Sequence, residues 1–298
     1  MTTHTEQYNK FPYPERDPED EKKRLVKTSL DDVKNIKEVT GLQLNKDSKI
    51  LVIGCGTGDQ TTYLSTQLQN TDILAIDLSE ASIAIAKKRL ENRNLSNVEF
   101  RCMDLFKLEL EGEFDYINAC GILHHLPDPL EGFKKVRQLL KPGGVAGIMV
   151  YGKYGRTGIT QMQVALKLLL KDESDVHEQI RITKDLLAGL IPTNWFCRGK
   201  DLVAAMQRDI DIYDILLNPS EKAYSLPEIW KEIDDADLEF VDFESAKTRL
   251  LLKPEMYISD REILRKLNNL TEEEKMVFTE VYAGVKTKHL FYVRRKNV

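Results

Sequence analysis

The residues best suited to chemistry lie directly after the first apolar run of the chain. Ile50–Ile53 leads straight into the glycine-rich turn Gly54-Cys55-Gly56-Thr57-Gly58, and a helical pattern begins at Asp59. Glycines let the backbone turn tightly and let a ligand approach main-chain atoms that side chains would otherwise cover. Because such turns also serve only to join a strand to a helix, this one indicates a ligand site when other residues support it.

Two acidic residues give that support. Asp77 ends the second apolar run, nineteen residues beyond Gly58, where a carboxylate can accept hydrogen bonds from both hydroxyls of an adenosine ribose. Asp104 follows the third apolar run, at the height where an adenine amino group would lie. Asp77 can instead cap the next helix, although Ser79 makes such a cap less necessary, and an acidic residue after a strand is common. Together with the turn, the two residues predict a nucleoside ligand.

His124 and His125 follow the fourth apolar run and are the candidates for a general base. His125 is favoured because it lies one residue nearer the following loop. A histidine at this place can also pack on a bound ligand or bond a backbone carbonyl, and that alternative stays open. His177 and His289 are interpreted as a surface residue and a strand residue.

Short apolar runs alternate with helical patterns as far as Tyr151, which predicts βαβ units and a parallel sheet. The expected strands are Ile50–Ile53, Ile73–Ile76, Val98–Cys102, Phe114–Cys120 and Val145–Tyr151. The expected helices are Asp59–Leu68, Ser79–Leu90 and a third that opens at Asp128 with Pro129 in its first turn. Beyond Tyr151 the alternation stops, and strands return only at Leu238–Phe243 and His289–Arg294. Seven strands with two helical insertions late in the chain are therefore expected.

Composition bounds the function. The chain has 298 residues, of which 42% are hydrophobic, enough for a real core, and its formal net charge is -5, which disfavours nucleic acid and anionic membrane as partners. No run approaches the 18 apolar residues of a membrane span, and the polar N-terminus lacks a signal peptide's apolar stretch, so a cytoplasmic location is expected. Four dispersed cysteines without CxxC spacing are expected to be reduced, and mostly to be small core residues. They are Cys55, Cys102, Cys120 and Cys197.

At this point the sequence resembles the class I S-adenosylmethionine-dependent methyltransferases. The matching segments are ILVIGCGTG at 50–58, ILAIDLSEASIAIAK at 73–87, VEFRCMDL at 98–105, FDYINACGILHHLPDP at 114–129 and LLKPGG at 139–144. The resemblance implies a Rossmann-like α/β fold of seven strands, the last antiparallel and placed between the fifth and sixth. It also implies that S-adenosylmethionine binds over the carboxyl ends of strands one to four, and no metal is implied.

Carried over residue by residue, the resemblance gives roles to the residues around the turn. Gly54, Cys55 and Gly56 would contact the amino-acid part of the cofactor, with Gly58 completing the turn. Asp77, followed by Leu78, would bind the ribose. The remaining cofactor residues would be Met103, Asp104 and Leu105 at the adenine, and Cys120 and Gly121, through their backbone, at the methionine moiety.

The flanks are similar to a narrower group of bacterial methyltransferases whose substrate is not assigned. The segments are YNKFPYPERDPEDE at 8–21, YGRTGI at 154–159, PTNWF at 192–196 and YDILLNP at 213–219. The candidate substrate-lining residues come mostly from these flanks: Tyr13, Arg16, Tyr151, Arg156, Gln161, Asn194, Trp195 and Tyr213. If Arg16 and Arg156 both reached the pocket, they would indicate an acidic substrate.

The chain is accordingly expected to divide into four segments. They are an N-terminal arm and charged, helix-prone stretch (1–44, with Glu19 to Glu38 helix-prone), a cofactor-binding core (45–151), a helical insertion (152–222), and the end of the sheet with a second insertion (223–298). The arm and the first insertion are expected to form a lid over the cofactor, because ligand sites lie at the carboxyl ends of parallel strands.

The expected function is methyl transfer to oxygen or nitrogen of a small molecule. Positioning should dominate, because the sulfonium sulfur leaves as a neutral group. A methyltransferase acting on protein or RNA is the main alternative. An NAD-dependent oxidoreductase is less favoured, because Asp59 follows Gly58 and the third glycine of GxGxxG is missing, and a non-catalytic cofactor-binding module is not excluded. The sequence indicates no oligomeric state.

Overall fold

The computed structural model describes residues 9–199, 206, 208–218 and 220–296, so the parts of the predicted arm and insertion at 1–8, 200–205, 207 and 219 lie outside the described residues. Its centre is one seven-stranded sheet in the order β3-β2-β1-β4-β5-β7-β6. The strands are β1 (Ile50–Ile53), β2 (Ile73–Asp77), β3 (Val98–Cys102), β4 (Phe114–Cys120), β5 (Leu140–Tyr151), β6 (Leu238–Phe243) and β7 (Lys288–Arg295).

The pairing directions confirm the predicted fold. β1 to β5 are parallel, whereas β7 runs antiparallel between β5 and β6. The usual dinucleotide-binding sheet has the order 3-2-1-4-5-6 and no such strand, so the topology separates this chain from the NAD-dependent alternative.

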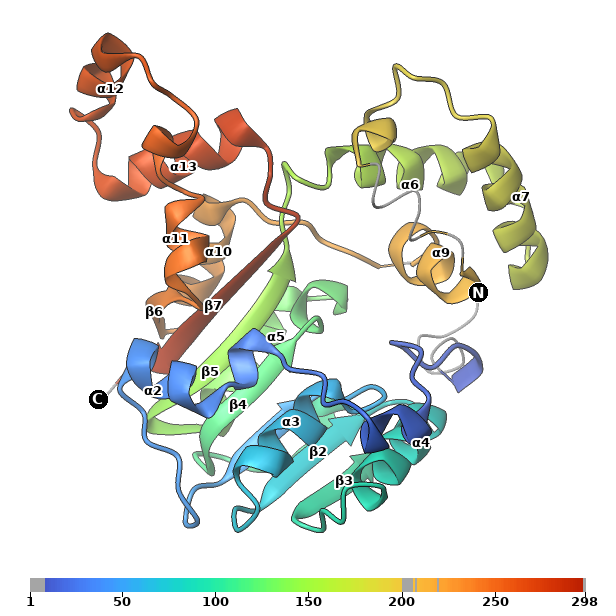
Figure 1. The fold of residues 1–298 in the computed structure, drawn as a ribbon, viewed down its shortest axis with the longest axis vertical. Helices are drawn as coiled ribbons and strands as arrows, with labels where there is room; N and C mark the ends of the chain where they lie inside the picture. The colour runs from blue at the N-terminus through green and yellow to red at the C-terminus, as the bar shows by residue number, and fades with distance from the viewer. Residues whose placement is uncertain (1–8, 200–205, 207, 219, 297–298) are drawn as a thin grey trace.

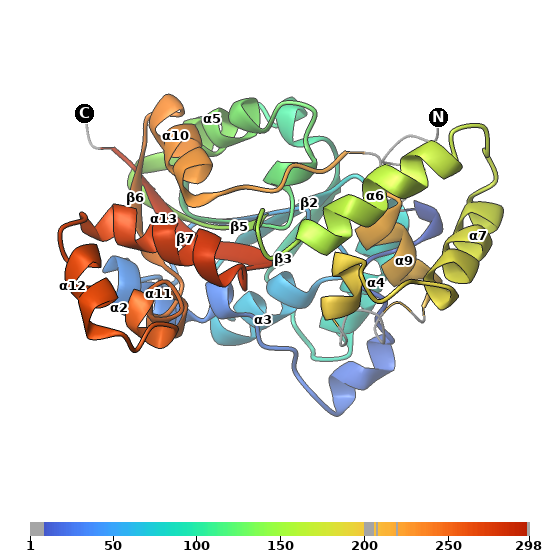
Figure 2. The ribbon, with the colours of Figure 1, turned by 90° about the horizontal axis from the view of Figure 1, so that it is seen from above.

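Helices cover both faces of the sheet (Figures 1 and 2). One layer holds α2 (Val33–Thr40), α3 (Asp59–Gln67) and α4 (Glu80–Glu91), and the other holds α5 (Pro129–Leu139) and α10 (Leu226–Asp235). The second insertion contributes α11 (Ala246–Leu250), α12 (Arg261–Leu267) and α13 (Glu272–Ala283). Short 3-10 turns complete the described chain at Pro18–Lys22, Ser29–Asp31, Leu105–Lys107, Leu123–His125, Trp195–Arg198 and Pro254–Met256.

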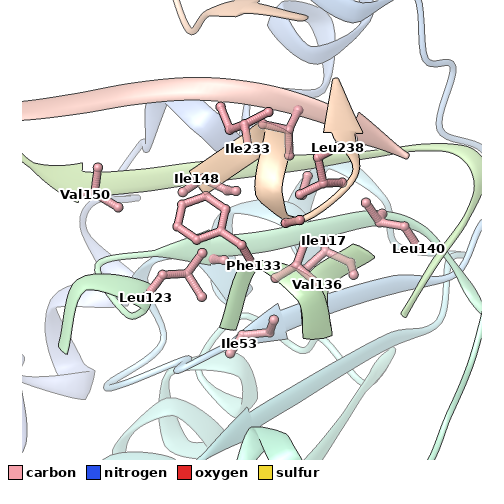
Figure 3. Packing of buried hydrophobic residues seen from close by; sticks show 14 of the residues in the cluster. Ile53, Ile117, Leu123, Phe133, Val136, Leu140, Ile148, Val150, Ile233 and Leu238 are labelled. Carbon is pink, nitrogen blue, oxygen red and sulfur yellow. The ribbon is translucent and has the colours of Figure 1, made fainter. Parts of the chain in front are cut away.

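The main core lies between the sheet and the α5–α10 layer. Figure 3 shows Phe133 and Val136 of α5 and Ile233 of α10 beside Ile117 and Ile148 of the sheet. Burying a side chain of this size contributes about 1.5 to 3 kcal/mol. Central strands covered on both faces need apolar residues at every position, which explains why β1 is buried throughout.

Local signals set where the helices begin. The Ser79 hydroxyl accepts from the backbone N–H of Ser82 at 3.0 Å, so Ser79 caps α4 as predicted. Asp128 caps α5, and Pro129 occupies its first turn. These two helices begin at the ends of β2 and of the segment after β4, so their caps also define the loops that face the predicted ligand.

Three expectations were wrong in detail. The stretch Glu19–Glu38 is not one helix but two 3-10 turns followed by α2, because Glu21 and Leu30 are drawn into buried sites on different parts of the core. Cys102 is exposed rather than a core residue, because β3 is the edge strand. β5 begins at Leu140 and not at the expected Val145. The Pro142–Gly144 segment therefore belongs to the strand and does not separate it from α5.

The first insertion builds a separate hydrophobic cluster, and Figure 1 shows its helices beyond the ends of the strands. It contains α6 (Thr157–Leu169), α7 (Val176–Ala188) and α9 (Asp209–Leu216). Phe11 of the N-terminal arm packs against this cluster, with its ring 5.3 Å from that of Tyr213. The arm therefore joins the insertion to the core. Among the described residues, no helix is long and apolar enough to cross a membrane.

Candidate active site

The glycine turn joins β1 to α3 in a left-handed backbone. Gly54, Gly56 and Gly58 have φ of 63°, 49° and 97°, a region that side chains disfavour. A Cβ at Gly56 would also lie 2.6 Å from the carbonyl oxygen of Tyr13, so here the close approach comes from the protein's own arm. Gly58 brings no side chain to cap α3, and backbone N–H groups at such a helix start attract anions such as a carboxylate.

Asp77 ends β2 beside this turn. Its Oδ2 accepts from the N–H of Gly56 at 2.7 Å, and its Oδ1 accepts from the N–H of Ser79 at 2.8 Å. Burial raises the pKa of Asp77, and the backbone N–H bonds oppose that shift. The carboxylate is thus fixed at the carboxyl end of β2 and retains lone pairs with which to accept further hydrogen bonds.

The other cofactor candidates lie at the neighbouring strand ends. Asp104, after β3, accepts from the N–H of Phe106 at 2.8 Å and so caps the next turn, while Leu105 is buried in the core. Gly121, after β4, has φ of 82°, and its N–H donates to the Met149 carbonyl at 3.2 Å. Leu78, Met103 and Cys120 are half-buried. The sequence-predicted set therefore gathers at the carboxyl ends of β1 to β4.

These groups fit a nucleoside that carries an amino acid. The start of α3 suits a carboxylate, and Asp77 suits ribose hydroxyls. Asp104 has one oxygen committed to its cap and one that can face an amino group.

The N-terminal arm lies directly on this turn. The Thr57 hydroxyl donates to the Pro14 carbonyl at 2.7 Å. Arg16 binds Asp59 with two parallel hydrogen bonds, from Nε at 2.8 Å and from Nη2 at 2.6 Å. Although burial alone would raise it, Arg16 and Arg89 hold the pKa of Asp59 below its usual range. Arg16 therefore anchors the arm rather than offering an unpaired cation to a substrate.

A buried arginine on α4 completes the attachment. Arg89 donates to Glu21 of the arm, to the Thr57 carbonyl at 2.7 Å and to Asp59 at 2.8 Å. The Arg89 and Glu21 side chains are only 1% and 3% exposed. One side chain thus ties together the arm, the glycine turn and α3.

The two candidate histidines lie in the turn after β4 and differ sharply in environment. His124 is fully buried, its ring 4.1 Å from that of Tyr151 at the end of β5. Burial, then the neighbouring His125 and Arg156, hold its pKa well below the usual range, so the ring is neutral. Neither ring nitrogen makes a hydrogen bond of good geometry with the described residues.

His125 is half-buried and held by the loop that precedes α10. Its Nδ1 lies 2.9 Å from the Ser220 carbonyl oxygen, which requires a proton on Nδ1. In the neutral ring, Nε2 is then the nitrogen that can accept a proton.

Arg156, at the start of α6, meets the same cluster. Its guanidinium carbon lies 3.6 Å from the centre of the Tyr151 ring, and its Nη2 lies 2.6 Å from Oε1 of Glu221. Burial raises the pKa values of Tyr151 and of Tyr13, and the charge of Asp214 raises both further. The structure thus brings Tyr13, Tyr151 and Arg156 into one region.

The remaining substrate candidates lie elsewhere in the insertion. Gln161 is exposed and accepts from the Trp195 N–H, and Asn194 caps the turn that Trp195 begins. Trp195 is half exposed and stacks on Arg198 at 4.0 Å. Tyr213 is buried against Phe11. An open cleft of ≈ 450 Å³ between the arm, α4 and α9 includes Arg16 but none of the cofactor candidates.

Sequence reasoning missed Glu21, Arg89, Asp214 and Glu221. Arg89 resembles any basic residue in the last turn of a helix, and Glu21 and Glu221 lie in polar stretches without periodicity. The motif YDILLNP contained Asp214, but spacing alone does not show that it faces two tyrosines.

Residues 51–146 match the family model described as a methyltransferase domain. The chain is 34% identical over 200 residues to an uncharacterized protein of Synechococcus, covering 65% of this chain and 48% of that one. It is 29% identical over 138 residues to a ubiquinone biosynthesis O-methyltransferase of Acinetobacter baumannii, covering 45% of this chain and 57% of the relative. The chain thus spans about half the length of these relatives.

Among solved structures, PKMT2 from Rickettsia typhi, in complex with AdoHcy, superposes with a TM-score of 0.71 at 17% identity. The match covers 91% of this chain and 54% of that one, and it supports the fold. The matched domain at 51–146 and the antiparallel β7 between β5 and β6 identify a class I methyltransferase domain, whose cofactor is S-adenosylmethionine, within this chain.

Proposed function

We propose that this protein transfers the methyl group of S-adenosylmethionine to an oxygen or nitrogen atom of a small molecule bound beside His124, His125 and Tyr151. The observation that carries the proposal is the buried polar cluster at the ends of β4 and β5, which the insertion encloses. Small-molecule sites bring a few convergent polar groups together in mostly apolar surroundings, and the contacts of Tyr151 with His124 and Arg156 gather such groups here.

The chain's own residues would divide the work. Asp77 and the N–H groups at the start of α3 would hold the cofactor, whose electrophilic methyl group supplies the reactive carbon. His125, fixed through Nδ1, would take the acceptor's proton on Nε2. His124 is the weaker base because its pKa is lowered, so it would orient the acceptor by hydrogen bonding.

Positioning should account for most of the acceleration. Holding an acceptor in line with the sulfur–methyl bond can remove about 7 to 11 kcal/mol of the barrier in ideal cases. A general base contributes less, a rate increase of about a hundredfold or more. Tyr151 would serve that role, because its ring contacts both His124 and Arg156 and would supply a rigid wall.

The test is a single-turnover reaction with S-adenosylmethionine labelled at the methyl group. A bacterial extract is divided into small-molecule, protein and RNA fractions, and each is offered to the enzyme separately. We expect label to transfer only in the small-molecule fraction. Transfer to protein or RNA would replace the proposed acceptor class, and binding without any transfer would support a non-catalytic module.

A further inference from the structure

We infer that the acceptor carries an uncharged polar group, both donor and acceptor of hydrogen bonds, which binds the ion pair of Arg156 and Glu221. This inference rests on the proposed function and names the substrate class of the same site. It replaces the expectation of an acidic substrate.

The ion pair is deeply buried yet only partly used. Nη2 of Arg156 lies 2.6 Å from Oε1 of Glu221, and each side chain is about 5% exposed. Gln163 adds a second hydrogen bond to the same oxygen, Nε2 to Oε1 at 3.3 Å. Nε of Arg156 and Oε2 of Glu221 make no hydrogen bond within the described residues.

Such a pair is costly unless something completes it. Buried charged groups are tolerated when their remaining donors and acceptors are hydrogen-bonded, and each one left unmet is destabilising. The unused donor is Nε of Arg156 and the unused acceptor is Oε2 of Glu221, and these residues are the two members of one ion pair. A hydroxyl or carboxamide could satisfy both atoms at once.

A carboxylate or phosphate could satisfy only half of this arrangement. It would accept from Nε of Arg156 but would bring negative charge to Oε2 of Glu221, and like charges brought together in an interface repel each other. An ammonium group would meet the opposite conflict with Arg156. The pair therefore selects for a neutral group.

Within the described part of the chain, the other arginines that act on Tyr13 are themselves paired with carboxylates. Arg16 is paired with Asp59 at 2.6 Å, and Arg208 is paired with Asp211 at 2.6 Å. Asp214 adds negative charge close enough to raise the pKa values of Tyr13 and Tyr151. Each arginine near the cluster thus already faces a carboxylate.

The ion pair also lies close to the proposed catalytic histidines. The Arg156 guanidinium and the His124 ring both contact the ring of Tyr151, at 3.6 Å and 4.1 Å. A group bound at the pair would therefore lie beside the ring of Tyr151, which also contacts the two histidines. A purely structural pair, joining the start of α6 to the loop before α10, is the competing explanation.

Three probes of equal size separate these explanations: benzamide is neutral, benzoate is anionic and benzylamine is cationic. Their affinities are measured by NMR titration of the full chain loaded with S-adenosylhomocysteine. We expect wild type to bind benzamide about tenfold or more tightly than either ion, which corresponds to about 1.4 kcal/mol. Glu221→Gln should bring benzoate within a few-fold of benzamide, whereas Glu131→Gln, in an exposed pair with Lys134, should change nothing.

Arg156→Lys distinguishes binding from structure. Lysine keeps the charge opposite Glu221 but lacks the Nε donor, so it should preserve the melting temperature yet weaken benzamide about tenfold. The inference fails if Arg156→Lys binds benzamide like wild type, if Glu221→Gln leaves the probe ratios unchanged, or if wild type prefers benzoate or binds no probe. If one of these results is found while S-adenosylhomocysteine binds normally, the proposed function still stands. If wild type does not bind S-adenosylhomocysteine, the proposed function itself is refuted.

Discussion

Arg89 of α4 and Glu21 of the N-terminal arm form an ion pair in which both side chains are almost completely buried, with Nε of Arg89 2.9 Å from Oε1 of Glu21. Arg89 also donates to the carbonyl of Thr57, inside the glycine turn, at 2.7 Å. The position of the arm and the shape of the turn are therefore coupled through one guanidinium.

Glu21→Ala should lower the free energy of unfolding by about 3 kcal/mol, because it leaves part of a buried cation uncompensated. It should also weaken S-adenosylhomocysteine binding, because the arm would no longer hold the turn. Urea unfolding and calorimetry measure the two effects. Glu19→Ala is the control, since the contacts of Glu19, an ion pair with Lys22 and a hydrogen bond from Asn92 at 3.3 Å, are exposed, and equal stability of the two variants would contradict the prediction.

Asp77→Ala should weaken binding of S-adenosylmethionine and S-adenosylhomocysteine by about 1.5 to 3 kcal/mol, through loss of charge-assisted hydrogen bonds to the ribose. A lower melting temperature should accompany it, because the N–H groups of Gly56 and Ser79 lose their acceptor. Calorimetry with the exposed Asp72→Ala as control decides the matter. Wild-type binding of NAD, with neither sulfur nucleotide bound, would contradict the cofactor assignment.

His125→Ala should reduce turnover about a hundredfold or more while cofactor affinity changes little, as expected for loss of a general base. Single-turnover rates on the identified acceptor measure this, with the exposed His177→Ala as the matched control. If binding and rate fell equally, His125 would instead pack against the cofactor.

Hydrogen exchange should show the arm and the insertion ordering together over the bound cofactor. Phe11 packs on the insertion, and Thr57 bonds the arm, so a local opening of one segment would disturb the other and the glycine turn. Adding S-adenosylhomocysteine should raise protection at residues 9–20 and across α6 and α9, as well as at the glycine turn. Protection limited to the turn and Asp77 would mean that neither segment is a cofactor-coupled lid.

Asp31 should make stability fall as the pH rises. Burial raises its pKa to about 7, although hydrogen bonds from Thr28 and Asn118 oppose the shift, whereas the unfolded value is about 3.9. The folded protein therefore retains a proton that the unfolded chain has lost. The resulting stability is complete below pH ~4 and is lost as the pH rises through ~7.

The loss between pH 5 and 8 should be about 2 to 3 kcal/mol in urea unfolding. Asp31→Asn should abolish this slope, because an amide does not titrate. The fold should be kept, since the asparagine amide can donate to Thr28 and its carbonyl can accept from Asn118. The exposed Asp47→Asn should keep the wild-type slope. A slope unchanged in Asp31→Asn would assign the pH dependence to another group.

The sequence by itself determined the sheet and the cofactor-side candidates. Alternating apolar runs and helical patterns located β1, β2 and β4 within a residue or so, because central parallel strands must be apolar at almost every position. Gly56 and Asp77 could be proposed from spacing alone. A glycine turn and the end of a strand are each only a few residues long, so the residues that give them their chemistry lie close together in the sequence.

Only the tertiary structure decided which side chains meet across long separations. Arg89 finds Glu21 across 68 residues, and Arg156 finds Glu221 across 65. Nothing in a linear pattern distinguishes these residues from surface charges, since burial and pairing depend on how separate segments pack. The charge available to a substrate was decided there too, because Arg16 and Arg156 read as cations in sequence but are each neutralised by a carboxylate far away in the sequence.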